Sequence, residues 1–387
     1  MLKRLLYILI ILFSSTVSSQ LSKTHYIPPI TSGVTNAIPN DQYLYISTPS
    51  QGQVNFTIKS GDGVQLSSGQ VSNNAPFRYT IEDNGYSVFV QEASQTSRVN
   101  SDLGFIVESD SPTYVSIRLN AGGGNNPPQA GALVSKGVNG LGTSFRVGTY
   151  DNQGSPSADG NYVNFFSFMA TEDNTTINLT NERVSSGLII ENFGSNQFPI
   201  NNIVLNKGQS YVVAVRSEKS TTNRDGLIGT LISSDKPIVV NSGSSNGSFG
   251  NGNARDYGID QIVGSDKIGD EYILVRGAGD ASYENVLIVA NEDDTEISVN
   301  GNSVTTIDAG FYHIVEGDSY VPNNNMYVST NKNVFVYQGI GGASEANQGM
   351  FFVPPLSCGS RGNVDNIPDI GSIGSRPFTG GITIVTR

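Results

Sequence analysis

The sequence has 387 residues and a net charge of −12, and only 14% of its residues are charged. An average soluble domain has about 25% charged residues, so the polar surface must come largely from Asn, Ser, Thr, Gln and the 44 glycines. No basic cluster follows residue 4, which excludes nucleic acid as a partner, because a phosphate-binding surface needs Lys and Arg. A hydrophobic content of 37% is enough for about two or three globular domains.

Residues 1–19 are predicted to be a signal peptide. Lys3 and Arg4 precede an apolar run at residues 5–13, and small residues at 17–19 place the cleavage before Gln20. The apolar run is too short for a transmembrane helix, which needs about 20 residues, and no later stretch is longer. We therefore expect a protein that is secreted or held at the cell surface, with residues 20–40 as an extended, poorly packed leader.

A hairpin pattern recurs along the chain. Its copies lie at 43–58, 165–179 and 286–299, and a fourth begins at residue 381. Aligning Ile58, Ile177 and Ile297 gives a period of about 120 residues, with a shorter last period of about 95. We expect repeats at residues 41–136, 137–263 and 264–370, with 371–387 as the start of a truncated fourth repeat of a longer protein.

The predicted fold is all-β. Runs such as 54–58 and 295–299 alternate apolar and polar residues, and Asp, Asn and Gly lie between paired runs. Each repeat adds a second hairpin, at 104–117, 229–240 and 326–337, whose Val115, Val239 and Val336 are expected to be buried at one equivalent position. Repeats of about 100–120 residues favour β-sandwich modules. The alternative is a six-bladed propeller-like ring with two blades per repeat.

Residue patterns for catalysis are missing. The sequence lacks a phosphate-binding glycine loop, CxxC, HExxH and a nucleophile elbow, and its histidines are His25 in the leader and His313 in a predicted strand. Cys358 is expected to be a buried thiol or to pair with a cysteine beyond residue 387. We predict that the protein is not an enzyme and has no catalytic, cofactor-binding or metal-binding residues.

Acidic residues cluster at two equivalent hairpin tips, 172–173 and 292–294, and Asp151, Asp159 and Asn161 flank a Gly/Ser/Pro loop. Carboxylate and amide oxygens suit Ca²⁺, so calcium binding is kept as an alternative. None of these segments matches an EF-hand loop, and the favoured interpretation is that these residues form turns.

The segment 242–261 is rich in Gly, Ser and Asn and contains Phe249, Arg255 and Tyr257. This composition is typical of an adaptable binding loop with aromatic anchors. We predict that these three residues bind a ligand, together with similar shorter loops at 120–129 and 339–348; the alternative is a plain connection.

Three segments carry a resemblance to a known family. The leader LSKTHYIPPI at 21–30, the hairpin SSDKPIVV at 233–240 and the stretch from VPPLSC to DIGSIG at 353–374 resemble the IgGFc-binding protein N-terminal domain. The resemblance covers about residues 21–387. It implies an N-terminal part of a large surface protein of gliding bacteria, exported by type IX secretion. It carries over no immunoglobulin-contacting residue.

The sequence thus predicts a non-catalytic extracellular binding or adhesion module. Its expected partner is an extracellular glycoprotein, a glycan or another surface ligand. The first alternative is a structural spacer or stalk, and the second is a secreted polysaccharide hydrolase.

Overall fold

The period-two alternation of the sequence produces strands along the whole chain. The computed structural model describes residues 20–33, 37–82, 85–121, 129–152, 162–184, 186–195, 198–249, 255–342, 348–356 and 367–378. Within these ranges the fold is all-β, with short 3₁₀ turns and no α-helix, which confirms the predicted class. None of the described residues forms a helix with the length and hydrophobicity to cross a membrane. The predicted signal peptide, Cys358 and the strand from residue 381 lie outside the described residues.

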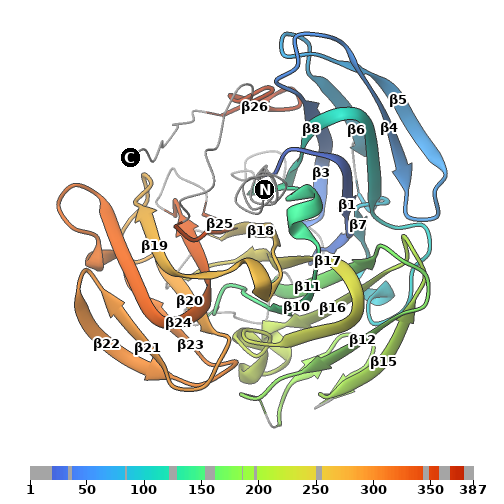
Figure 1. The fold of residues 1–387 in the computed structure, drawn as a ribbon. Helices are drawn as coiled ribbons and strands as arrows, with labels where there is room; N and C mark the ends of the chain where they lie inside the picture. Colours follow the sequence, from blue (N-terminus) through green and yellow to red (C-terminus); the bar gives the residue numbers. More distant parts are fainter. Residues whose placement is uncertain are drawn as a thin grey trace, which may run out of the picture.

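Three antiparallel sheets, each a repeat of the same plan, form three modules (Figure 1). The first contains β1 (Ser22–Ile27), β3 (Pro39–Ser47), β4 (Val54–Ser60), β5 (Gln65–Val71), β6 (Phe77–Glu82), β8 (Phe105–Ala121) and β9 (Gln129–Val134). The second contains β10 (Gly142–Arg146), β11 (Val163–Ala170), β12 (Thr175–Thr180), β13 (Ile189–Ile190), β14 (Gly194–Ser195), β15 (Ile200–Leu205), β16 (Ser210–Arg216), β17 (Leu231–Gly247) and β18 (Asp256–Ile262). The third contains β19 (Gly269–Val275), β20 (Val286–Ala290), β21 (Thr295–Val299), β22 (Asn302–Ile307), β23 (Tyr312–Val315), β24 (Asn325–Ile340) and β25 (Gly349–Phe352).

Two small ladders lie outside these sheets. The parallel pair β2 (Ile30–Thr31) and β7 (Val90–Gln91) connects loops of the first module, and β26 (Ser372–Ile373) pairs with β27 (Arg376–Pro377) near the end of the described chain. The 3₁₀ turns are η2 (Ala93–Gln95), η3 (Gly137–Gly140), η4 (Ser217–Lys219), η5 (Thr221–Arg224), η6 (Ser265–Lys267) and η7 (Gly317–Ser319).

One long strand, β8, β17 or β24, organises each module. Its first half pairs with β1 and β4 in module 1, and its second half pairs with β3 and β9. The other two modules repeat this arrangement. Each sheet therefore curls into a half-barrel whose two halves cover one core. Six separate blades are ruled out, because the two halves of each module share one continuous strand.

The predicted second hairpin is wrong, because the long strand bends there without reversing. At the bend a hydroxyl hydrogen-bonds to the carbonyl two residues later in all three modules: Ser109 to Ser111 O (2.8 Å), Ser234 to Lys236 O (2.7 Å) and Thr330 to Lys332 O (2.6 Å). Pro112 and Pro237, which lack an N–H, lie at the same bend and resemble turn formers in the sequence.

These pairings also correct the repeat alignment. Ser109, Ser234 and Thr330 pair with Phe56, Ile177 and Ile297, so Phe56 is the true equivalent of the two isoleucines. Ile58 lies two residues further along and is also fully buried, because a shift of two keeps a side chain on the same face of a strand. Likewise Val240, and not Val239, corresponds to Val115 and Val336.

The leader was predicted to pack poorly, and this is wrong. Strand β1 occupies the edge of module 1 that β10 and β19 occupy in the other modules. Ile27, Ile30 and His25 are fully buried. The prolines at 28 and 29 that obscured the strand lie just after its end, where they interrupt no ladder hydrogen bond.

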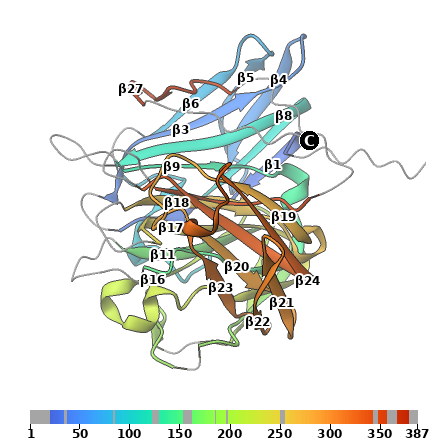
Figure 2. The same ribbon diagram turned by 90° about the vertical axis from the view of Figure 1, so that its left-hand side faces the viewer.

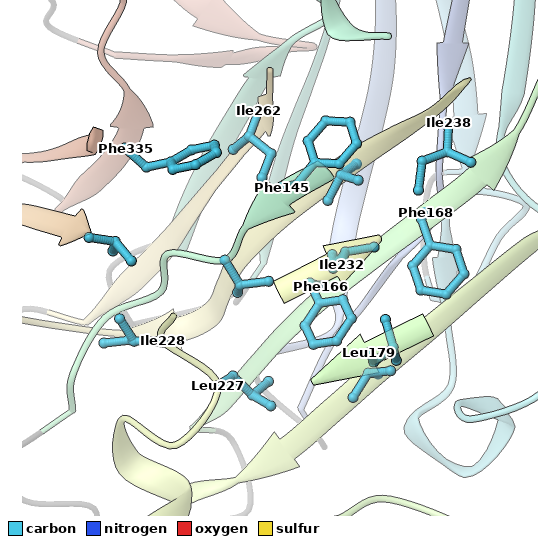
Figure 3. Close-up of a cluster of buried hydrophobic side chains, with 14 of the residues drawn as sticks. Phe145, Phe166, Phe168, Leu179, Leu227, Ile228, Ile232, Ile238, Ile262 and Phe335 are labelled. Carbon is cyan, nitrogen blue, oxygen red and sulfur yellow. The ribbon is translucent and has the colours of Figure 1, made fainter. Parts of the chain in front are cut away.

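The three modules surround a common middle in which the last strands meet (Figures 1 and 2). Strand β18 packs between β9 and β25. The hydrophobic clusters cross the module boundaries: one joins modules 1 and 2 through Phe165 and Tyr257, and another joins modules 2 and 3. Figure 3 shows the second, where Phe335 of module 3 lies near Phe145 and Ile262 of module 2. The modules are therefore one packed unit and not beads on a string.

A fully buried polar residue occupies the same place in every module: Gln42, Asn164 and Glu284. In module 3 the carboxylate of Glu284 accepts hydrogen bonds from the backbone N–H groups of Gly277, Gly279 and Gly341. It thereby joins the loop before β20 to the end of β24.

We expect Glu284→Gln to reduce the free energy of unfolding by about 2 kcal/mol, since the amide keeps the shape but turns an NH₂ group toward a backbone donor. Urea unfolding of this variant measures the loss. Glu296→Gln makes the same chemical change at an exposed position of β21 and should be nearly neutral. Equal midpoints for the two variants would contradict the assigned role.

Candidate functional site

The hairpins β8–β9, β17–β18 and β24–β25 lie side by side, and their outermost pairs are Ala121 with Gln129, Gly247 with Asp256 and Ile340 with Gly349. We call this end of the module array the hairpin end. It contains the three residues predicted to bind a ligand. Residues 122–128, 250–254 and 343–347 of the predicted loops lie outside the described residues.

Phe249 and Tyr257 are buried, so the prediction that both form exposed anchors is wrong. The Phe249 ring packs edge-on against Tyr150 at 4.9 Å, and its N–H donates to Gln348 Oε1 of module 3 (3.3 Å). The Tyr257 hydroxyl donates to the carbonyl of Ala37 in module 1. These two aromatic residues join module 2 to its neighbours on both sides.

Arg255 is the one predicted anchor that stays partly exposed. Its guanidinium lies over the ring of Tyr162, 4.7 Å from the ring centre. A guanidinium stacked on an aromatic ring is already ordered and loses little further conformational freedom on binding. Of the described residues at the hairpin end, Arg255 is therefore the best placed to contact a ligand.

The second half of β17, which pairs with β18 next to Arg255, carries many buried polar side chains. Residues 241–248 of β17 and its continuation include six buried Ser and Asn side chains. Ser244 Oγ donates to Asn164 Oδ1, which also accepts from Asn152 Nδ2 (3.0 Å). Asn164 Nδ2 in turn donates to the carbonyls of Tyr150 (3.0 Å) and Arg224 (2.7 Å). The network fixes the backbone from which the hairpin end projects.

Asp256 is almost fully buried at the same end. One carboxylate oxygen accepts from the N–H of Tyr257 (2.9 Å), and no described residue donates to the other. Burial raises the pKa of Asp256 well above the usual value for an aspartate. No sequence pattern marks Asp256 as buried, since it directly follows Arg255 in a polar segment.

The acidic hairpin tips form turns, as favoured. Asp173 Oδ1 accepts from Lys207 N (3.0 Å), and Asp293 Oδ1 accepts from Ala309 N (3.1 Å), so each carboxylate holds the neighbouring turn of its own module. Asp159 and Asn161 lie outside the described residues. In the described part of the chain, no group of three His, Cys, Asp or Glu side chains is arranged to hold a metal ion.

The two histidines lie in strands, His25 in β1 and His313 in β23. His313 lies in β23, where burial lowers its pKa. His25 lies at the seam between modules 1 and 2, with Nε2 beside the carbonyls of Ser22 (3.1 Å) and Thr113 (3.0 Å) and Nδ1 beside Ser135 Oγ (3.0 Å). The two carbonyl oxygens require the proton on Nε2, so Nδ1 accepts from the hydroxyl.

Burial lowers the pKa of His25 to about 4. The folded protein therefore keeps His25 neutral. The contribution of this neutral side chain to the free energy of unfolding is fully present above pH 6.5, and it is lost as the pH falls from 6.5 toward 4. The expected total loss is about 3 kcal/mol. Urea unfolding between pH 7 and pH 4 should show a shallower dependence on pH for His25→Gln than for the parent, and equal slopes would contradict this.

Comparison with known families gives the chain its place. The family described as IgGFc binding protein matches residues 131–386. The chain belongs to this family. The IgGFc binding protein match begins within β9 and includes all of modules 2 and 3, so it also includes Phe249, Arg255, Asp256 and Tyr257.

Outside the IgGFc binding protein family, the likenesses are weak. The chain matches no curated protein. Similar solved structures include a Ca²⁺-stabilized adhesin that helps an Antarctic bacterium bind ice (10% identity, 88% of this chain, 74% of that chain, TM-score 0.13). Others are a fibronectin-III array of RIM-binding protein (8%, 87%, 99%, 0.11) and a Streptomyces avermitilis α-L-rhamnosidase (9%, 87%, 45%, 0.10). At such TM-scores none of them bears on fold or function.

Proposed function

We propose that this protein is a non-catalytic extracellular binding module of a bacterial cell-surface protein. The observation that carries the proposal is membership of the IgGFc binding protein family across modules 2 and 3. The ligand we propose is an extracellular glycoprotein, with the Fc part of immunoglobulin G as the first candidate. The predicted signal peptide supports export, and the resemblance to surface proteins of gliding bacteria supports the type IX route.

The packing of the modules supports a binding role over a spacer. A stalk gains length by joining its repeats end to end, whereas these three modules lie around a common middle and share hydrophobic clusters (Figure 1). The shared clusters fix the spacing of the three hairpins, which is what a rigid binding surface requires. The spacer and the polysaccharide hydrolase remain as the two alternatives.

The proposal is tested by measuring binding of the protein to immobilised immunoglobulin G, its Fc and Fab fragments, a mucin and a glycan panel. Arg255→Ala should weaken binding of the identified ligand about tenfold, as loss of an arginine at an interface often does. Arg98→Ala removes an arginine from an exposed site in module 1 and is the matched control.

Each outcome separates the alternatives. Binding to Fc that Arg255→Ala weakens and Arg98→Ala does not would support the proposal at this end of the array. Failure to bind any member of the panel would favour the spacer. Release of reducing sugar from a polysaccharide would favour the hydrolase.

A further inference from the structure

The outer face formed by the strand pair β3–β6 in module 1, β11–β16 in module 2 and β20–β23 in module 3 is a docking face. In module 2 it contains Phe165 of β11 and Val212 of β16, which are fully buried in a cluster shared with module 1. In module 3 it contains Leu287 of β20 and Ile314 of β23, which pack in the cluster shared with module 2. Each module thus docks this face on the module before it.

Module 1 has no preceding module in this structure, and its docking face differs in chemistry. Tyr45 of β3 pairs with Arg78 of β6, in the register in which Leu287 pairs with Ile314. Arg78 therefore takes the place of Val212 and Ile314. Module 1 thus carries an arginine at a position where the other two modules carry aliphatic side chains.

The segment 367–378, which contains β26 and β27, covers this face (Figure 1). Ile373 clusters with Tyr43 and Tyr45, and all three are buried. Arg78 Nη1 lies 3.3 Å from Asp369 Oδ2, and Arg118 Nη1 donates to the Asp369 carbonyl (2.9 Å).

The two arginines also lie over the two tyrosines. Arg118 is 4.4 Å from the ring centre of Tyr45, and Arg78 is 5.3 Å from that of Tyr43. Asp369 and Ile373 of the covering segment thus contact a surface built from two stacked Tyr–Arg pairs.

The contact of Gly374 with Tyr43 requires a glycine. Gly374 has φ +59°, and a Cβ at this position would lie 2.3 Å from the hydroxyl oxygen of Tyr43. Only glycine combines this backbone conformation with so close an approach to the ring. The covering segment is therefore fitted to the face and not merely laid across it.

The contact between the covering segment and module 1 differs from the contacts between modules in its residue types. The faces of modules 2 and 3 bury Phe165, Val212 and Leu287 completely, and such apolar faces are typical of permanent interfaces, whereas the face of module 1 is built from Tyr and Arg, which are enriched where a protein surface binds a partner. The Arg78–Asp369 pair keeps about half of its surface in solvent, with side-chain exposures of 45% and 42%. Such a pair contributes little to the stability of the capped state.

We propose that residues 367–378 are an exchangeable cap, and that the Tyr43–Tyr45–Arg78–Arg118 face binds a β-turn of another polypeptide when the cap leaves. The partner turn has the chemistry of the cap: a carboxylate between the two arginines, an aliphatic side chain on the two tyrosines and a glycine against Tyr43. This second surface is independent of binding at the hairpin end.

The test uses the full chain carrying Gly374→Val, which expels the cap but leaves every residue of the face intact. Hydrogen exchange at residues 372–377 reports whether the cap has left. A fluorescent peptide with the sequence of residues 367–378 is then titrated into both proteins. Because a tethered segment competes at an effective concentration of about 1 mM, the peptide should bind the variant at least tenfold more tightly than the parent.

Two controls make the result decisive. Adding Arg118→Ala to Gly374→Val should abolish peptide binding, and a peptide carrying Asp369→Asn should bind more weakly. Where Gly374→Val leaves exchange unchanged, Ile373→Asp removes the cap instead by placing a charge on the tyrosines. Equal affinity of parent and uncapped protein, or no peptide binding by either uncapped variant, would overturn the proposal without touching the function proposed at the hairpin end.

Discussion

Replacing Asp260 with alanine is expected to lower the free energy of unfolding by about 3–5 kcal/mol, as removal of one partner of a buried ion pair does. Asp260 lies in β18, where one carboxylate receives donors from all three modules. Lys136 Nζ of module 1 lies 2.8 Å from Oδ2, and the N–H of Phe352 in module 3 donates to the same oxygen (3.1 Å). Alanine leaves the buried ammonium and this N–H without their acceptor.

Chemical denaturation measures the loss, and Asp266→Ala is the matched control. Asp266 pairs with Lys267 at 3.0 Å, but its side chain is 67% exposed, so its removal should cost less than about 1 kcal/mol. Hydrogen exchange adds a second measurement: Asp260→Ala should raise exchange in β9 and β25 as well as in β18. Equal losses for the two alanine variants would show that the central ion pair does not hold the modules together.

The repeat and its strands were predictable because alternation is local. Ile58, Ile177 and Ile297 are all buried as expected, although Ile58 was aligned two residues out of register. Period-two patterning fixes the face of a strand but not its position along the partner, so the error did not affect burial. The bend at Pro112 and Pro237 was misread as a turn for the same reason, since pairing of both halves of β8 or β17 is a long-range property.

The candidate site was less predictable, because contacts between modules leave no periodic signal. Phe249 and Tyr257 interrupt a Gly, Ser and Asn-rich segment and therefore look exposed, yet each contacts a different neighbouring module, Phe249 through Gln348 and Tyr257 through Ala37. His25 looked like part of a loose leader because two prolines follow it, and its three hydrogen-bonding partners lie in residues 22, 113 and 135. The predicted repeats divide the cap at residue 370, between the third repeat and a truncated fourth, because its partners on β3, β6 and β8 are more than 200 residues away in sequence and leave no local pattern.

Replacing Phe335 with alanine tests whether the three modules unfold as one unit. Phe335 belongs to β24 but is fully buried in the cluster shared with module 2, and its ring centre lies 6.3 Å from that of Phe352 (Figure 3). Truncation removes a large buried ring and leaves a cavity, so the expected loss is about 3–5 kcal/mol. Phe311→Ala is the control, since Phe311 in the same module is 41% exposed and its truncation should cost less than about 1 kcal/mol.

The shape of the unfolding transition shows whether the modules unfold together, which the loss of free energy alone does not show. If modules 2 and 3 share one core, Phe335→Ala lowers the midpoint of a single transition, and calorimetric and van't Hoff enthalpies stay equal. Hydrogen exchange in β11 and β16 of module 2 should then rise together with exchange in β20 and β23. A variant in which module 3 melts first while module 2 keeps the parent's protection would show that the modules fold separately. That result would restore the independent β-sandwiches of a stalk, and with them the spacer function.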